Sequence, residues 1–320
     1  MRRLLVSGIA LAAVLLTGVP VRAAGFDFAN QPNDAPIEVT AEQGLEWSQD
    51  GQRITARGKA RAVRGGVTVT ADVLIAHYIQ ANSQTQVSRL EAHGNVTIKT
   101  ATEEATGSLA IYDVTAATMT LKGAPARIVT ATDTITARDG IEYNENTRIA
   151  VARGDALDIH GDKRIRADVL TATFTAAEAP PVKPVKPVKP ATPAKPAAGA
   201  AGKEDPQAGK MALEKAHAVG GVVITSPTDV ASGDVGDYDA KSGIVTLSGS
   251  VKITRGANQL NGGYALFNMN TGVSNILASA PGTKGKGRVE GLFSPQKDGA
   301  GASPLGKGNA QGKDAQGKGL

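Results

Sequence analysis

TLSGSVKITRG, residues 246–256, sets a glycine at the midpoint of a strand-like stretch. Leu247 lies before Gly249, and Val251 and Ile253 follow it, each separated from the next by one residue. Such alternation with period two is typical of a β-strand with one buried face. A glycine inside a strand weakens it unless the strand bends, bulges or changes sheets there. The stretch therefore predicts one long strand that bends at Gly249.

The same arrangement recurs along the chain at a spacing of about 30 residues, which is the mark of a repeat architecture. A small residue follows each glycine after 12 to 14 positions, and an aromatic residue follows the small one after five to seven. Each unit predicts a hairpin with one strand that carries the small and aromatic residues and one that bends at the glycine. The glycines are Gly58, Gly94, Gly123, Gly154, Gly221 and Gly249; the small residues are Ala71, Gly107, Ala137, Ala167, Gly233 and Gly262; the aromatics are Tyr78, Tyr112, Tyr143, Phe174, Tyr238 and Phe267, with Trp47 one unit earlier.

We therefore expect an all-β fold in which evenly phased corners wrap one long meander into a twisted, partly open, two-layered β-jelly roll or a β-solenoid. If the layers do not close fully, the inward aliphatic side chains line a long apolar slot; if they do close, the same residues form a dry core. The alternation pattern fits both arrangements.

Composition shifts divide the chain into segments. Residues 1–23 combine two arginines, an apolar run and Val-Arg-Ala, which predicts a cleaved secretory signal peptide, with a retained membrane anchor as the alternative. Residues 178–215 are rich in Pro, Ala and Lys, and residues 281–320 in Gly and Lys, so we expect a disordered insert and a disordered tail. The jelly roll is expected over 24–177 and 216–280, with the repeat phase continuous across the insert.

Charge and cysteine content narrow the function further. The net charge of +5 comes from the leader, the insert and the tail, and the remainder is net acidic, so the chain has no basic face for nucleic acid. The chain has no cysteine, which excludes disulfides, thiolate metal sites and cysteine nucleophiles.

Candidate catalytic residues are few. Glu91 and His93 share one strand face and could act as an acid and a base, and Asp72 and Asp168 could form a carboxylate pair. Both pairs have a plainer interpretation as outer-face partners and as repeated residues near a strand start. No His pair has metal-ligand spacing. We expect no enzyme, no cofactor and no metal.

Three segments carry a family resemblance: residues 235–272, residues 141–174 and, more loosely, residues 45–78. Their repeated pattern of a small residue, an aromatic and TLSG-like strands resembles the OstA-like (LptA) family of periplasmic lipopolysaccharide-transport proteins. The resemblance extends from about 37 to 277 without the insert.

The resemblance implies a periplasmic carrier that shields the acyl chains of lipid A in an apolar β-groove. It also implies edge-strand contacts with inner-membrane LptC-like and outer-membrane LptD-like proteins, and head-to-tail self-association. A membrane-anchored LptC-like component, or an envelope scaffold that carries no lipid, is the alternative. The groove-lining residues that it implies are Ile37, Val39, Val69, Val96, Ile98, Ile111, Ile149, Val151, Leu157, Ile159, Val222, Ile224, Val245, Leu247, Val251 and Ile253.

Overall fold

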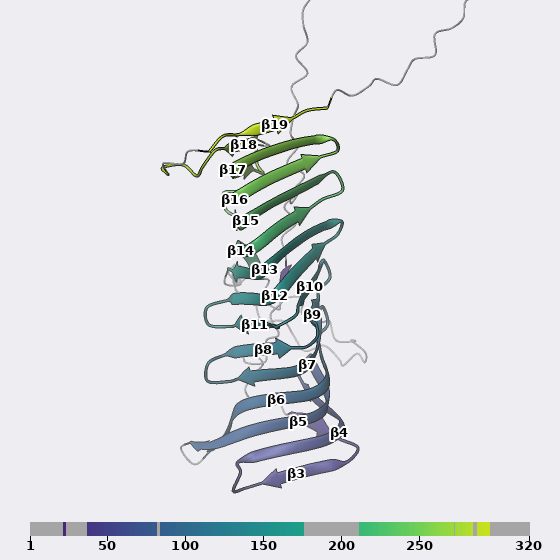
Figure 1. The fold of residues 1–320 in the computed structure, drawn as a ribbon. Helices are drawn as coiled ribbons and strands as arrows, with labels where there is room; N and C mark the ends of the chain where they lie inside the picture. The colour runs from purple at the N-terminus through teal and green to yellow at the C-terminus, as the bar shows by residue number, and fades with distance from the viewer. Residues whose placement is uncertain are drawn as a thin grey trace, which may run out of the picture.

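The computed structural model describes residues 22–23, 37–81, 84–175, 211–271, 273–283 and 287–294. These residues form strands that pair antiparallel and stack into a tall column from β3 at one end to β19 at the other (Figure 1). Every described secondary-structure element is a strand, which confirms the all-β expectation. No helix long and apolar enough to cross a membrane occurs in the described ranges.

The strands fall into long and short classes. The long ones are β4 (Arg53–Arg64), β5 (Val67–Ala81), β6 (Gln84–Lys99), β7 (Glu104–Asp113), β12 (Ile149–His160), β13 (Lys163–Phe174), β14 (Met211–Thr225), β15 (Asp229–Asp239), β16 (Ile244–Arg255) and β17 (Asn258–Asn268). The short ones are β1 (Arg22–Ala23), β2 (Glu38–Thr40), β3 (Gly44–Ser48), β8 (Thr118–Lys122), β9 (Ala126–Val129), β10 (Asp133–Ala137), β11 (Gly140–Asn144), β18 (Val273–Leu277) and β19 (Glu290–Leu292).

Each long even-numbered strand bends at its marker glycine. Between β16 and β17 the pairing skips from Ser248 to Val251, and Gly249 has a φ of +87°. A Cβ at Gly249 would also collide with the Asp234 carboxylate of the neighbouring strand, so only glycine fits this corner. Equivalent register shifts fall at Arg57/Ala60, His93/Val96, Arg153/Ala156 and Val219/Val222.

The prediction that the marker glycines are corners is therefore confirmed. At Gly123 the corner is an interruption, because β8 ends at Lys122 and β9 begins at Ala126. At the fifth corner Gly220 has a positive φ as well as Gly221.

The corners divide the sheet into two arms that face each other. The aromatic arm contains β3, β8, β11, β18 and the halves of the long strands that carry the repeat aromatics; the opposite arm contains β2, β9, β10, β19 and the other halves. Buried side chains from both arms form two core clusters, one over β5–β12 (cluster 1) and one over β13–β17 (cluster 2). The interior is thus a narrow apolar layer between the arms.

The segment boundaries differ in two places from those expected. Strand β14 begins at Met211, so residues 211–215 belong to the sheet and not to the insert. Strand β19 pairs with β17, so part of the region beyond 281 is ordered. Residues 1–21, 178–210, 284–286 and 295–320 of the proposed leader, insert and tail lie outside the described residues, and these assignments stay predictions.

Candidate functional site

Half of the expected groove residues are buried in the interior. Leu247 is fully buried, and the residues on the same face of β16 are almost as inaccessible. Val69 is half-buried and packs against cluster 1. The buried set is Val96, Ile98, Val222, Ile224, Val245, Leu247, Val251 and Ile253.

Two expected residues lie near the edge of the sheet. Ile37 is 42% exposed, and Val39 on the short strand β2 is half-buried opposite Ala62, whose partner on β5 is Val69. Ile111 lies between the buried residues Ala110 and Tyr112, so its side chain points to the outer face. On β12 the inner face is formed by alanine and polar residues. Expectations of an inward direction were therefore wrong for Ile111, Ile149, Val151, Leu157 and Ile159.

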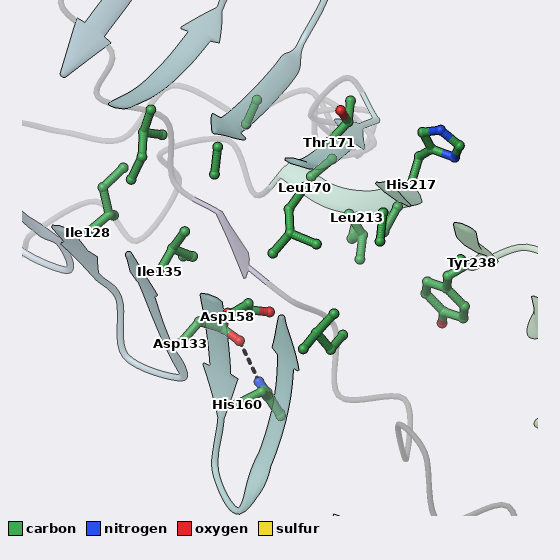
Figure 2. Close-up of a pocket in the computed structure, with 18 of the residues that line it drawn as sticks. Ile128, Asp133, Ile135, Asp158, His160, Leu170, Thr171, Leu213, His217 and Tyr238 are labelled. Carbon is green, nitrogen blue, oxygen red and sulfur yellow. Dashed lines mark hydrogen bonds and ion pairs between the residues drawn. The ribbon is translucent and has the colours of Figure 1, made fainter. Parts of the chain in front are cut away.

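A cavity of about 260 Å³ lies where the two clusters meet. Its walls come from β8–β16 and from both arms, and they are mostly aliphatic and aromatic. Figure 2 shows Ile128 and Ile135 of the opposite arm and Leu170 and Leu213 of the aromatic arm around this space. Tyr143 and Phe174, which also line it, pack edge to face with ring centroids 6.5 Å apart. The cavity is large enough to take a ligand, because a 150 Å³ apolar cavity already binds benzene.

One wall of the cavity is polar. His160 Nδ1 lies 2.6 Å from Asp133 Oδ1, and Asp158 lies beside this pair (Figure 2). Asp158 Oδ1 is inaccessible to solvent and finds no hydrogen-bond partner among the described residues. Burial, reinforced by the nearby Asp133 carboxylate, raises the pKa of Asp158 to about 7, although His160 and the Ile159 backbone N–H oppose the shift. The Asp158 carboxyl group therefore stays protonated up to nearly neutral pH.

The buried Asp133 belongs to a turn that occurs three times in the opposite arm. Each turn places Ser or Thr three residues before an acid and uses its hydroxyl to accept the acid's backbone N–H. This Ser/Thr turn fixes the acid at the start of the next strand. The sequence analysis missed it, although the similar tetrapeptides at 100–103, 130–133 and 226–229 (TATE, TATD and SPTD) are a readable signal.

In the third turn the acid, Asp229, pairs with an arginine, which is always charged. In the second turn the acid, Asp133, pairs with a histidine. Arg255 Nη2 donates to Asp229 Oδ2 at 2.8 Å, and this hydrogen bond holds the pKa of Asp229 below its ordinary value. Strand β16 ends at Arg255 just as β12 ends at His160. The Asp133–His160 pair therefore occupies the same place in its repeat as the Asp229–Arg255 pair, with histidine as a weaker base than arginine.

The candidate catalytic residues lie apart from this interior. Glu91 forms an ion pair with Arg89 at 3.0 Å and lies 2.8 Å from His93. Burial raises the pKa of Glu91, but the His93 hydrogen bond and the nearby Arg89 and His77 leave it below the ordinary value. Asp72 and Asp168 lie on different strands, each against a corner glycine, Gly94 and Gly220. Among the described residues, no group of three or more His, Asp or Glu could hold a metal ion.

The two ends of the sheet expose strand edges and apolar side chains. Leu45 and Trp47 of β3 are 58% and 67% exposed. At the other end, Val273 of β18 and Leu292 of β19 are 52% and 64% exposed. Unpaired edges of this kind can accept another strand.

Comparisons with known proteins identify the family. The sequence matches the family described as LptA/(LptD N-terminal domain) LPS transport protein over residues 38–148 and 134–273. Among solved structures, the chain is similar to LptH from Pseudomonas aeruginosa, described as the LptA homologous periplasmic component of the lipopolysaccharide transport device. The identity is 16%, the coverage is 51% of this chain and 95% of that chain, and the TM-score is 0.35.

No curated protein matches the chain. The assignment rests on the family match, which spans well over half of the residues and both sides of the insert. The chain belongs to the LptA/LptD N-terminal-domain family of lipopolysaccharide transport proteins.

Proposed function

We propose that the protein is a periplasmic carrier that shields the acyl chains of lipopolysaccharide in the groove between its two arms. The observation that carries the proposal is the cavity of about 260 Å³ in an apolar interior that both arms line. Hydrophobic contact is nondirectional and gains about 25 cal/mol for each Å² removed from water, so such walls suit flexible hydrocarbon chains. A carrier of this kind needs no catalytic group.

The exposed strand edges suit partners of the same fold. A partner strand that pairs with β3 or with β18 continues the antiparallel sheet, and the exposed Leu45 and Val273 add apolar contact at the junctions. Contacts at two different ends are heterologous and extend into a chain. We propose that inner-membrane and outer-membrane components of the pathway, or further copies of this chain, occupy these edges and so bridge the envelope.

Site-specific photocrosslinking tests the groove. A diazirine amino acid of about leucine's size at Ile135 or Leu170, which line the cavity, should capture lipopolysaccharide in cells that make it. The matched controls are Val151 and Ile159, aliphatic residues of β12 that alternate with its inner face. Equal labelling of the inner and outer pairs would refute a lipid groove, and absence of labelling at both would favour a scaffold that carries no lipid.

A further inference from the structure

At three corners the fourth residue after the corner glycine is a buried isoleucine. These residues are Ile98 after Gly94, Ile224 after Gly220 and Ile253 after Gly249. The corner at Gly154 instead places Asp158 there. The protein therefore carries a carboxyl group in a slot that neighbouring repeats fill with isoleucine, at the point where the interior widens into the cavity.

This substitution is costly for folding unless it serves another purpose. Asp158 Oδ1 is buried without a hydrogen-bond partner among the described residues. An unsatisfied buried polar atom costs about 1–3 kcal/mol, and an aliphatic side chain would remove this cost while it filled the space. Because the atom belongs to the wall of a cavity, a ligand in that cavity can supply the missing partner.

The groups that face Asp158 decide the chemistry of that partner. Asp133 on the adjacent strand β10 and His160 on β12 itself are already paired with each other. The other ionisable side chains of the cavity wall are Glu103, Tyr143, Lys163, His217, Asp237 and Tyr238. Of these, His217 is 2.7 Å from Asp237 and half-exposed. The immediate surroundings of Asp158 are otherwise aliphatic, with Ile135 and Ile165 as its partners on the neighbouring strands.

We propose that the Asp158 carboxyl group binds a hydroxyl group carried on an acyl chain that occupies the cavity. This inference rests on the proposed lipid-carrying function and adds a polar recognition point to it. A hydroxyl can both donate and accept one hydrogen bond, so it satisfies Asp158 in either protonation state. The aliphatic walls around the carboxyl group fit the hydrocarbon on each side of the hydroxyl.

A neutral hydroxyl fits better than an ammonium group. A cation would have to leave water for an apolar cavity, and its attraction to a carboxyl group would have to offset that desolvation. The burial that holds the proton on Asp158 to near neutrality shows that the site favours neutral groups. A hydroxyl enters at a much smaller desolvation cost.

Binding of matched fatty acids to the delipidated full-length chain tests the proposal. The probes are tetradecanoic acid and its derivatives hydroxylated at carbon 3 or carbon 12, with affinities from displacement of a fluorescent fatty acid. At least one hydroxylated probe should bind the wild type about fivefold to tenfold more tightly than tetradecanoic acid, as expected for one added hydrogen bond. Asp158→Asn should keep this preference because the amide still donates and accepts.

Asp158→Ile, which restores the residue of the other repeats, should lose the preference and still bind tetradecanoic acid. Asp162→Asn removes an acid from the exposed turn after β12 and should change neither affinity. Equal binding of plain and hydroxylated acids to the wild type, or a preference that survives in Asp158→Ile, would overturn the proposal and leave the groove intact. Failure of every probe to bind would remove the proposed lipid-carrying function itself.

Discussion

Replacing Asp158 with asparagine should stabilise the protein in a way that depends on pH. Burial raises the pKa of Asp158 from its ordinary value of 3.8 to about 7 in the folded protein. Between these values the folded state keeps a proton that the unfolded chain has released, so the stability that the wild type has near pH 4 falls as the pH rises to about 7 and then stays low. Each pH unit between the two pKa values lowers the free energy of unfolding by about 1.4 kcal/mol, so the total loss above pH 7 is about 4 kcal/mol.

Urea unfolding followed by far-ultraviolet circular dichroism measures this difference. Asparagine has the same shape and no charge, so the Asp158→Asn variant should be close to the wild type near pH 4 and up to about 4 kcal/mol more stable at pH 8. Subtracting the two proteins at each pH cancels most of the contribution of other groups. Asp162→Asn is the control, because it removes an exposed acid from the same hairpin. A stability difference that does not change between pH 4 and pH 8 would show that Asp158 is not a buried neutral acid.

Two further predictions concern the sheet itself. Gly249→Ala should lower the free energy of unfolding by about 2–3 kcal/mol, and Gly256→Ala by only about 1 kcal/mol. Both glycines have a positive φ, but only at Gly249 would the added Cβ collide with a neighbour. Equal losses in urea unfolding would argue against the packed corner. Replacing residues 178–209 with four Gly/Ser residues should preserve the fold, since Thr175 N–H already donates to the Ala212 carbonyl at 2.9 Å across the base of the insert. The shorter loop should stabilise the protein by up to about 2 kcal/mol, because closing it costs less entropy. A large fall in melting temperature would instead show that the insert packs against the sheet.

The corners were predictable from sequence because they depend on a residue type that few other positions require. Glycine tolerates the positive φ that a bend of this kind imposes, and its spacing is visible without any knowledge of pairing. The groove face of β12 was not predicted, because Val151 and Leu157 are more apolar than the alanines on the other face. Apolar alternation alone therefore selected the wrong side of the strand.

The structure supplies the rule that resolves this ambiguity. Inward residues lie an even number of positions from the glycine that forms the corner, as Leu247 and Val251 do from Gly249, and as Val222 does from Gly220 at the fifth corner. The same count from Gly154 selects Ala152 and Ala156, which are buried. Applied to the sequence, the count would also have placed Asp158 in the interior. The pairing of Asp133 with His160 needed the structure, because it joins two strands that are not consecutive along the chain.

If the interior carries acyl chains as proposed, the sizes of the core residues indicate where such a chain would enter. Eight of the fifteen buried residues of cluster 1 are alanine, so the arms lie close together there, and Leu121 in their midst is fully buried. A chain that entered cluster 1 would have to separate the arms and expose apolar surface at about 25 cal/mol for each Å². Beside Leu170 the cavity already provides room. The crosslinking residue should therefore capture more lipopolysaccharide at Leu170 than at Leu121, and the opposite order would show that the arms open along their length during transport.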